Sequence, residues 1–139
     1  PYVTPTVTPT NTNTTTTPPP TTSFSVNGTA SSSAGGGGVS LGAPEYEVTI
    51  NDATLGKITI DFGGPGKPPA GNYTLGGLPF GALQCAFAYS PTTSSFYGAT
   101  SDGSIVVSVS GSNTICTFNN VICPGTAPTT YTISGVIAF

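Results

Sequence analysis

Two carboxylates, Glu45 and Glu47, lie two residues apart in a segment where apolar residues alternate with polar ones. On a β-strand such side chains point to the same face, so the pair superficially matches the two acids of a glycoside hydrolase. Acids at this spacing are more often solubilising groups on an exposed strand. The chain contains no histidine, which excludes an imidazole base and the Ser-His and Cys-His nucleophile pairs. We therefore expect the protein not to be an enzyme.

Charged residues are few: two lysines and five acids make up 5% of 139 residues, with a net charge of −3. Such a chain cannot neutralise a run of phosphates, which argues against a nucleic-acid partner. No stretch approaches the roughly 20 apolar residues that span a bilayer. Calcium needs about six to eight oxygen ligands, and the sequence has no acidic loop of that kind. The sequence predicts no cofactor, no metal site and no membrane-spanning segment.

Three cysteines, Cys85, Cys116 and Cys123, stand in a chain rich in Thr, Ser, Gly and Pro. This composition is typical of secreted or cell-surface proteins, where a disulfide persists, so we expect an extracellular location. A hairpin turning at residues 119–120 would set Cys116 opposite Cys123. One long strand, bulged at the same asparagines, would separate them and leave Cys85 to pair with one of the two. We favour the long strand, with residues 131–139 as its partner.

Residues 1–22 consist mainly of threonine and proline and cannot form a core. This arm begins with a four-residue repeat: Pro-Tyr-Val-Thr, Pro-Thr-Val-Thr and Pro-Thr-Asn-Thr. In an extended chain the odd positions line one face and the threonines at even positions the other. Because proline lacks an N–H group, such a strand would pair through one edge only. The predicted subunit-contact residues are Pro1, Val3, Pro5, Val7 and Pro9.

From residue 23 onward, short runs of alternating apolar and polar residues are separated by turns rich in glycine and proline. This pattern predicts strands and no helix. The expected strands are 23–27, 45–51, 57–62, 72–75, 84–90, 95–99, 104–110, 114–123 and 130–139. So many short strands favour an all-β antiparallel sandwich, Ig-like or jelly-roll-like, over residues 23–139. Residues 35–38, four consecutive glycines, are expected to form a flexible connector.

Alternation also assigns the core, because every second side chain of a half-buried strand points inward. The predicted core residues are Phe24, Val26, Tyr46, Val48, Ile50, Ile58, Ile60, Phe62, Cys85, Phe87, Tyr89, Val107, Val109, Phe118, Ile133 and Ile137.

Several short motifs lie in the second half of the chain. They are Gly-Asn-Tyr-Thr-Leu-Gly-Gly at 71–77, Ala-Tyr-Ser at 88–90, Phe-Tyr at 96–97 before Gly-Ser-Ile-Val-Val-Ser-Val at 103–109, and Thr-Tyr-Thr-Ile-Ser-Gly at 130–135. In these motifs residues 24–139 resemble small secreted or surface all-β domains of Bacteroidota that carry a Thr/Pro-rich N-terminal linker. The resemblance implies a secreted, non-catalytic sandwich domain.

Two functions fit these features. The first is a structural subunit of an extracellular filament or pilus-like fibre, in which the arm docks on, or adds a strand to, a neighbouring copy of the same chain. The alternative is a carbohydrate-binding or adhesin module carried on the arm as a spacer. Sugars would then stack on aromatic faces, for which the candidates are Phe96 and Tyr2, Tyr46, Tyr73, Tyr89, Tyr97 and Tyr131.

The arm is also the expected site of O-linked glycans, because prolines keep its threonines extended and accessible; a plain disordered linker is the alternative interpretation. The candidate sites are Thr4, Thr6, Thr8, Thr10, Thr14, Thr15, Thr16 and Thr17. Intact-mass and glycopeptide mass spectrometry should find glycans concentrated on these residues. An unmodified arm would contradict this prediction.

Overall fold

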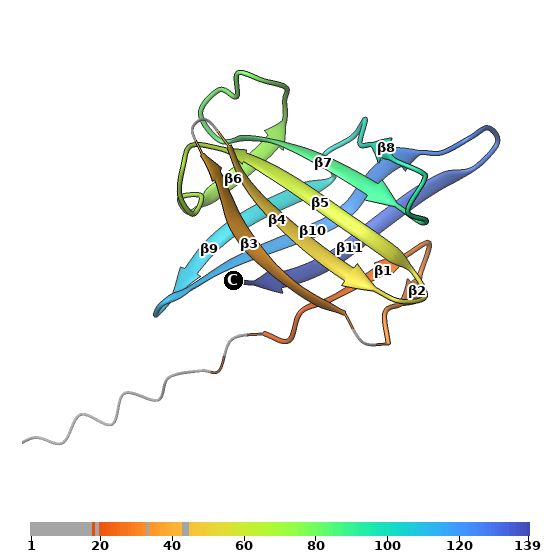
Figure 1. Ribbon diagram of the computed structural model, residues 1–139, viewed down its shortest axis with the longest axis horizontal. Coiled ribbons are helices and arrows are strands. Elements are labelled where there is room, and N and C mark those ends of the chain that lie inside the picture. The colour runs from red at the N-terminus through yellow and green to blue at the C-terminus, as the bar shows by residue number, and fades with distance from the viewer. Residues whose placement is uncertain (1–17, 19, 33, 43–44) are drawn as a thin grey trace, which may run out of the picture.

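The computed structural model describes residues 18, 20–32, 34–42 and 45–139, which form strands, turns and loops without a helix (Figure 1). The all-β prediction is confirmed. The arm's predicted contact residues and glycosylation sites lie outside the described residues. The strands are β1 (Ser23–Val26), β2 (Thr29–Ala30), β3 (Gly35–Gly42), β4 (Glu45–Asp52), β5 (Gly56–Gly63), β6 (Gly71–Leu75), β7 (Gln84–Ser90), β8 (Tyr97–Gly98), β9 (Ser104–Ser110), β10 (Asn113–Pro124) and β11 (Thr130–Ala138).

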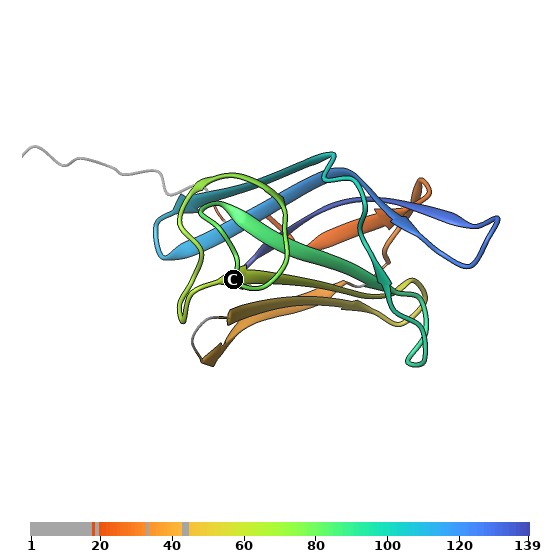
Figure 2. The same ribbon diagram turned by 90° about the horizontal axis from the view of Figure 1, so that it is seen from above.

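The strands form one open sheet in the order β2-β1-β11-β10-β9-β6-β7-β5-β4-β3, with β8 paired to β7. The sheet is mixed rather than wholly antiparallel, because β6 runs parallel to β7 and antiparallel to β9. A loop over residues 76–83 connects β6 to β7; it is longer than the two-residue turn of a hairpin, which can join only antiparallel neighbours. The half containing β9, β10 and β11 lies over the half containing β3, β4 and β5 (Figure 2).

The core lies between these two halves of the sheet. Along β4, Tyr46, Val48 and Ile50 are buried while their neighbours are less so, as period-two alternation requires. Across the core, the rings of Phe87 on β7 and Phe118 on β10 meet edge to face, with centroids 5.3 Å apart. Each such buried apolar side chain stabilises the fold by about 1.5–3 kcal/mol.

The predicted core residues are all buried except Val109, which is 59% exposed. The reason is that β6 pairs with β9 only as far as Val107, so the end of β9 extends past its neighbour. Sequence alternation missed six further buried apolar residues, namely Tyr73, Ala88, Ile105, Cys116, Val121 and Cys123.

The segment around Asn119 and Asn120 is one long strand with a bulge, as the sequence favoured. β10 pairs with β11 along most of its length, and the register shifts between Phe118 and Val121. Asn120 adopts a left-handed φ of 54°, and its main-chain N–H donates a 2.9 Å hydrogen bond to the Ser134 hydroxyl. The bulge reverses which residues face inward, so Phe118 and Val121 are both buried.

The four-glycine segment is not a connector, and that prediction was wrong. Residues 35–38 form the start of β3 and pair with β4. A Cβ on Gly36 would collide with the Thr49 carbonyl oxygen and lie 2.8 Å from Ile137 Cδ1. Glycine is therefore required here by close backbone packing within a strand.

This packing predicts opposite effects at two adjacent glycines. Gly36→Ala should destabilise the fold by about 1–3 kcal/mol, because the added methyl group overpacks the core. Gly37→Ala is the matched control: no atom lies within 4 Å of its Cβ position, so the change should be neutral or slightly stabilising. Urea unfolding of both variants measures the difference, and equal effects would contradict the packing described for β3.

Candidate functional site

The outermost strands of the sheet, β2 and β3, could bind another chain through main-chain hydrogen bonds. At the β2 end the edge is short, and two hydrogen bonds already link Phe24 to Ser31: Phe24 N–H donates to the hydroxyl at 3.0 Å, and Ser31 N–H donates to the Phe24 carbonyl at 2.7 Å. β3 is longer, and β4 is its one strand partner among the described residues. The second edge of β3 is therefore the longer of the two outer edges among the described strands.

Apolar side chains lie beside β3 on its inner face. The Tyr46 and Phe139 rings stack with centroids 5.9 Å apart. Lys67 holds Phe139 in place: its Nζ donates a 2.7 Å hydrogen bond to the Phe139 carbonyl oxygen and lies 5.8 Å from the ring centroid. Because Gly38 carries no side chain, the β3 backbone rests directly on the Tyr46 and Phe139 rings at this position, and at Gly36 it rests on Ile137.

The disulfide candidates Cys85, Cys116 and Cys123 are free, buried thiols, so the predicted disulfide is absent from the structure. Cys116 and Cys123 are seven residues apart on β10, roughly 23 Å along a strand, whereas a disulfide tolerates about 7 Å between Cα atoms. Burial raises the pKa of each thiol to about 12. Thiols that are buried and protonated in this way are inert side chains of the core.

Most of the candidate sugar-stacking aromatics belong to the core. Tyr46, Tyr73 and Tyr89 are buried, and the Tyr73 hydroxyl donates a 2.9 Å hydrogen bond to the Pro69 carbonyl. Tyr97 and Tyr131 are half-buried and pack on each other, with centroids 5.6 Å apart. Tyr2 lies outside the described residues. Phe96 is 69% exposed and, among the described aromatics, is the one whose ring faces solvent.

Three of the five acids gather on the outer face of β4 and β5. Glu45 and Glu47 share a face, as the sequence predicted, and Asp61 lies directly opposite Glu47. Asp61 Oδ1 is buried without a hydrogen-bond partner. Burial, together with the negative charges of Glu47 and Glu45, raises the pKa of Asp61. The sequence could not identify this third acid, because the pairing register brings it to the other two.

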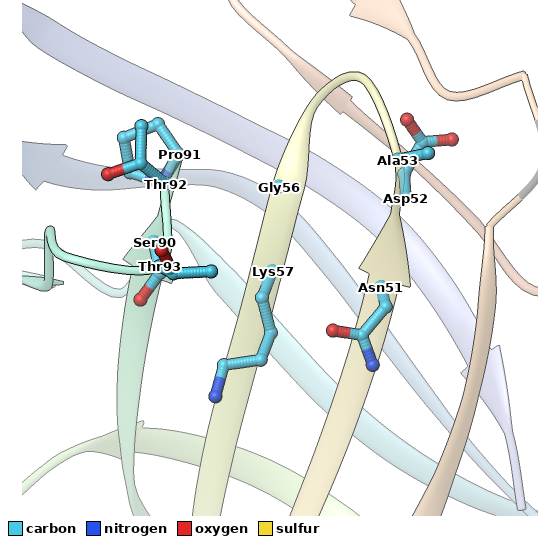
Figure 3. Close-up of a pocket in the computed structure, with 9 residues that line it drawn as sticks. All are labelled: Asn51, Asp52, Ala53, Gly56, Lys57, Ser90, Pro91, Thr92 and Thr93. Atoms are coloured by element: carbon cyan, nitrogen blue, oxygen red, sulfur yellow. The ribbon is translucent and has the colours of Figure 1, made fainter.

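A shallow pocket of about 480 Å³ lies at the end of β4, β5 and β7 (Figure 3). Asn51 and Lys57 face each other across β4 and β5, and Thr92 and Thr93 lie on the loop after β7. The Asp52 carboxylate is directed to the β4–β5 turn, where it accepts 2.9 Å hydrogen bonds from the N–H groups of Thr54 and Leu55. The pocket thus offers hydroxyls, an amide and one ammonium group, a set suited to hydrogen bonding with a polar ligand.

Within the described ranges, no three Cys, Asp or Glu side chains are arranged to hold a metal ion. Nor does that part of the chain contain a helix long and apolar enough to cross a membrane.

Comparisons with protein-family models, with curated proteins and with solved structures each gave no significant match. The resemblance to Bacteroidota surface domains therefore stays a prediction.

The position of Asp61 predicts a pH-dependent stability. The folded chain binds a proton at Asp61 more tightly than the unfolded chain, whose carboxyl titrates near pH 3.9. This contribution is complete below that pH and is lost as pH rises through the folded pKa. Asp61→Asn should therefore stabilise the fold at pH 7, by up to about 1 kcal/mol, and have less effect at pH 3.5.

Urea unfolding of the wild type and the variant at both pH values measures this difference. Glu47→Gln is the companion variant: it keeps Asp61 but removes the opposing carboxylate, so it should reproduce part of the gain at pH 7. A gain from Asp61→Asn that is the same at both pH values would contradict the account.

Proposed function

We propose that this protein is a non-catalytic structural subunit of an extracellular filament or pilus-like fibre, assembled head to tail through its N-terminal arm. The arm of one copy docks on, or adds a strand to, the next copy. The observation that carries the proposal is the open sheet, whose outermost strand β3 has one strand partner in the described chain. We further propose that the folded sheet serves as a sandwich-like unit.

The arm has the reach for this role. At about 3.1 Å per residue in an extended conformation, 22 residues extend on the order of 70 Å. A domain of this size has a radius of gyration of about 13 Å. The prolines at positions 1, 5 and 9 all fall on odd positions, which leaves the other edge of the arm with complete main-chain donors over these residues. Such a segment suits the end of a sheet, where one side is paired and the other is not.

The connectivity supports head-to-tail growth. The arm leads into β1, which lies next to one end of the strand order, whereas β3 lies at the other end. A contact between two different surfaces of identical subunits is heterologous, and it generates an open fibre where the rotation does not close a ring. With seven charged side chains in the chain, subunits can pack with little electrostatic repulsion, and glycans on the arm would keep the fibre soluble.

A carbohydrate-binding module remains the second candidate, favoured by the polar pocket beside Lys57 and by the exposed ring of Phe96. Sugar-binding sites combine an aromatic platform with hydrogen-bonding groups. Phe96, however, lines a different pocket, with Asp61 and Leu75, whereas Lys57 lines the first. The two halves of a sugar site are thus in separate pockets, and the filament is the better-supported function.

Assembly should depend on the apolar face of the arm. Each valine that leaves water should contribute about 1.5 kcal/mol or more at every contact along a fibre. Changing Val3 and Val7 together to Asp should therefore abolish assembly, as should deletion of residues 1–12, while the melting of the domain stays nearly unchanged. Negative-stain imaging and gel filtration measure assembly.

The matched control changes Thr4 and Thr8 to Ser, which alters the opposite face of the arm and should leave assembly intact. The proposal would be overturned if purified full-length protein were a clean monomer, or if the double-Asp variant assembled normally. Binding to a glycan array by such a monomer would instead favour the carbohydrate-binding module.

A further inference from the structure

β3 is an edge strand that lacks the residues that usually prevent an edge from pairing with another chain. Its sequence, Gly-Gly-Gly-Gly-Val-Ser-Leu-Gly, contains no charged residue and no proline, the features that commonly protect an edge strand from pairing. The glycines at 35–38 are exposed. A register shift between Ser40 and Gly42 ends the regular pairing with β4, so the straight part of the edge is 35–40. Six residues is an ordinary strand length, and the addition of a strand to an exposed sheet edge is an established mode of peptide recognition.

The opposite end of the sheet, at β2, offers a much shorter edge. β2 has two residues, and it is tied to β1 through a turn in which Asn27 and Gly28 have left-handed φ values of 50° and 82°. The Asn27 side chain accepts a 2.8 Å hydrogen bond from Thr132 N–H and donates a 3.2 Å hydrogen bond to the Thr130 carbonyl. Because β2 has two residues and the turn before it is hydrogen-bonded to β11, this end offers little length for another strand to pair with.

The inner face beside β3 presents an apolar surface to an added strand. A Cβ on Gly38 would lie 2.6 Å from the Tyr46 ring and 2.9 Å from Phe139 Cδ2, so this face of β3 is in contact with both rings. Phe139 is half-buried. Apolar side chains of an added strand would therefore extend the core at its border.

Resting on the filament function, we propose that β3 is the acceptor edge and that a segment containing Val3 and Val7, within residues 1–12 of a second copy, forms the added strand. In this arrangement the even-numbered residues of the arm, none of which is proline in residues 1–12, direct their N–H and C=O groups to β3. Val3 and Val7 then lie on the face shared with Gly36 and Gly38, against the Tyr46 and Phe139 rings. The threonines lie on the outer face, the same side as Gly37, where glycans do not obstruct the contact.

Disulfide trapping between separate chains tests this arrangement. One chain carries a single cysteine in the arm, as Thr4→Cys, Thr6→Cys or Thr8→Cys, and the other carries Gly37→Cys. No atom lies within 4 Å of the Cβ position of Gly37, and Gly35, equally open, provides a second acceptor variant if needed. The native cysteines are buried and stay protonated, so they do not compete. The matched control acceptor is Thr29→Cys on the exposed β2 edge.

After mild oxidation of each mixture, at least one arm position should cross-link to position 37 about 10-fold more than to position 29. Equal or greater cross-linking to position 29 would overturn the β3 assignment. The absence of a cross-link to position 37 from every arm position would also overturn it. The same holds if, in a chain carrying both cysteines, the disulfide forms within that chain and not between two chains. In each of these cases, loss of assembly on deletion of residues 1–12 would show that the filament function still stands, and persistence of assembly would remove both proposals.

Discussion

An open β-sheet leaves main-chain donors and acceptors unpaired along its outermost strands, and here those strands are β2 and β3. The sheet folds over one core without a helix in the described chain to cover its ends. Edge groups must then be satisfied by water, by local hydrogen bonds or by another chain. At the β2 end, Ser31 hydrogen-bonds Phe24 of β1 and Asn27 hydrogen-bonds Thr132 of β11, so positions of those two strands without a strand partner are satisfied locally. The β3 end has no comparable cap among the described residues, and the proposed function follows from this asymmetry.

Much of the fold could be predicted from alternation, because strands buried on one face carry the pattern in their side chains. β4, β5, β7 and β9 were located closely in this way. β3 was not, because four glycines have no side chains to alternate, and close packing against Ile137 and Tyr46 can be known only from the fold. Val109 was misassigned because its exposure depends on where a neighbouring strand ends.

The candidate sites also differ in whether the sequence alone or only the strand pairing reveals them. The one-sided pairing predicted for the arm depends only on where its prolines stand, which can be read from the sequence. The acceptor edge, the third acid of the Glu45–Glu47 row and the pocket beside Lys57 depend on pairing register, which the sequence does not give. Conversely, the thiols and most of the tyrosines, which are chemically the most versatile groups, are used in packing.

The most direct test of the account is amide hydrogen exchange of assembled full-length protein beside the domain lacking residues 1–12. If the arm of a neighbour pairs with β3, exchange of the amides in residues 35–40 should slow by about 10-fold or more on assembly, with little change at β2. Exchange across β3 that is the same in both samples would contradict the account, because a strand paired on both edges cannot exchange like a strand paired on one.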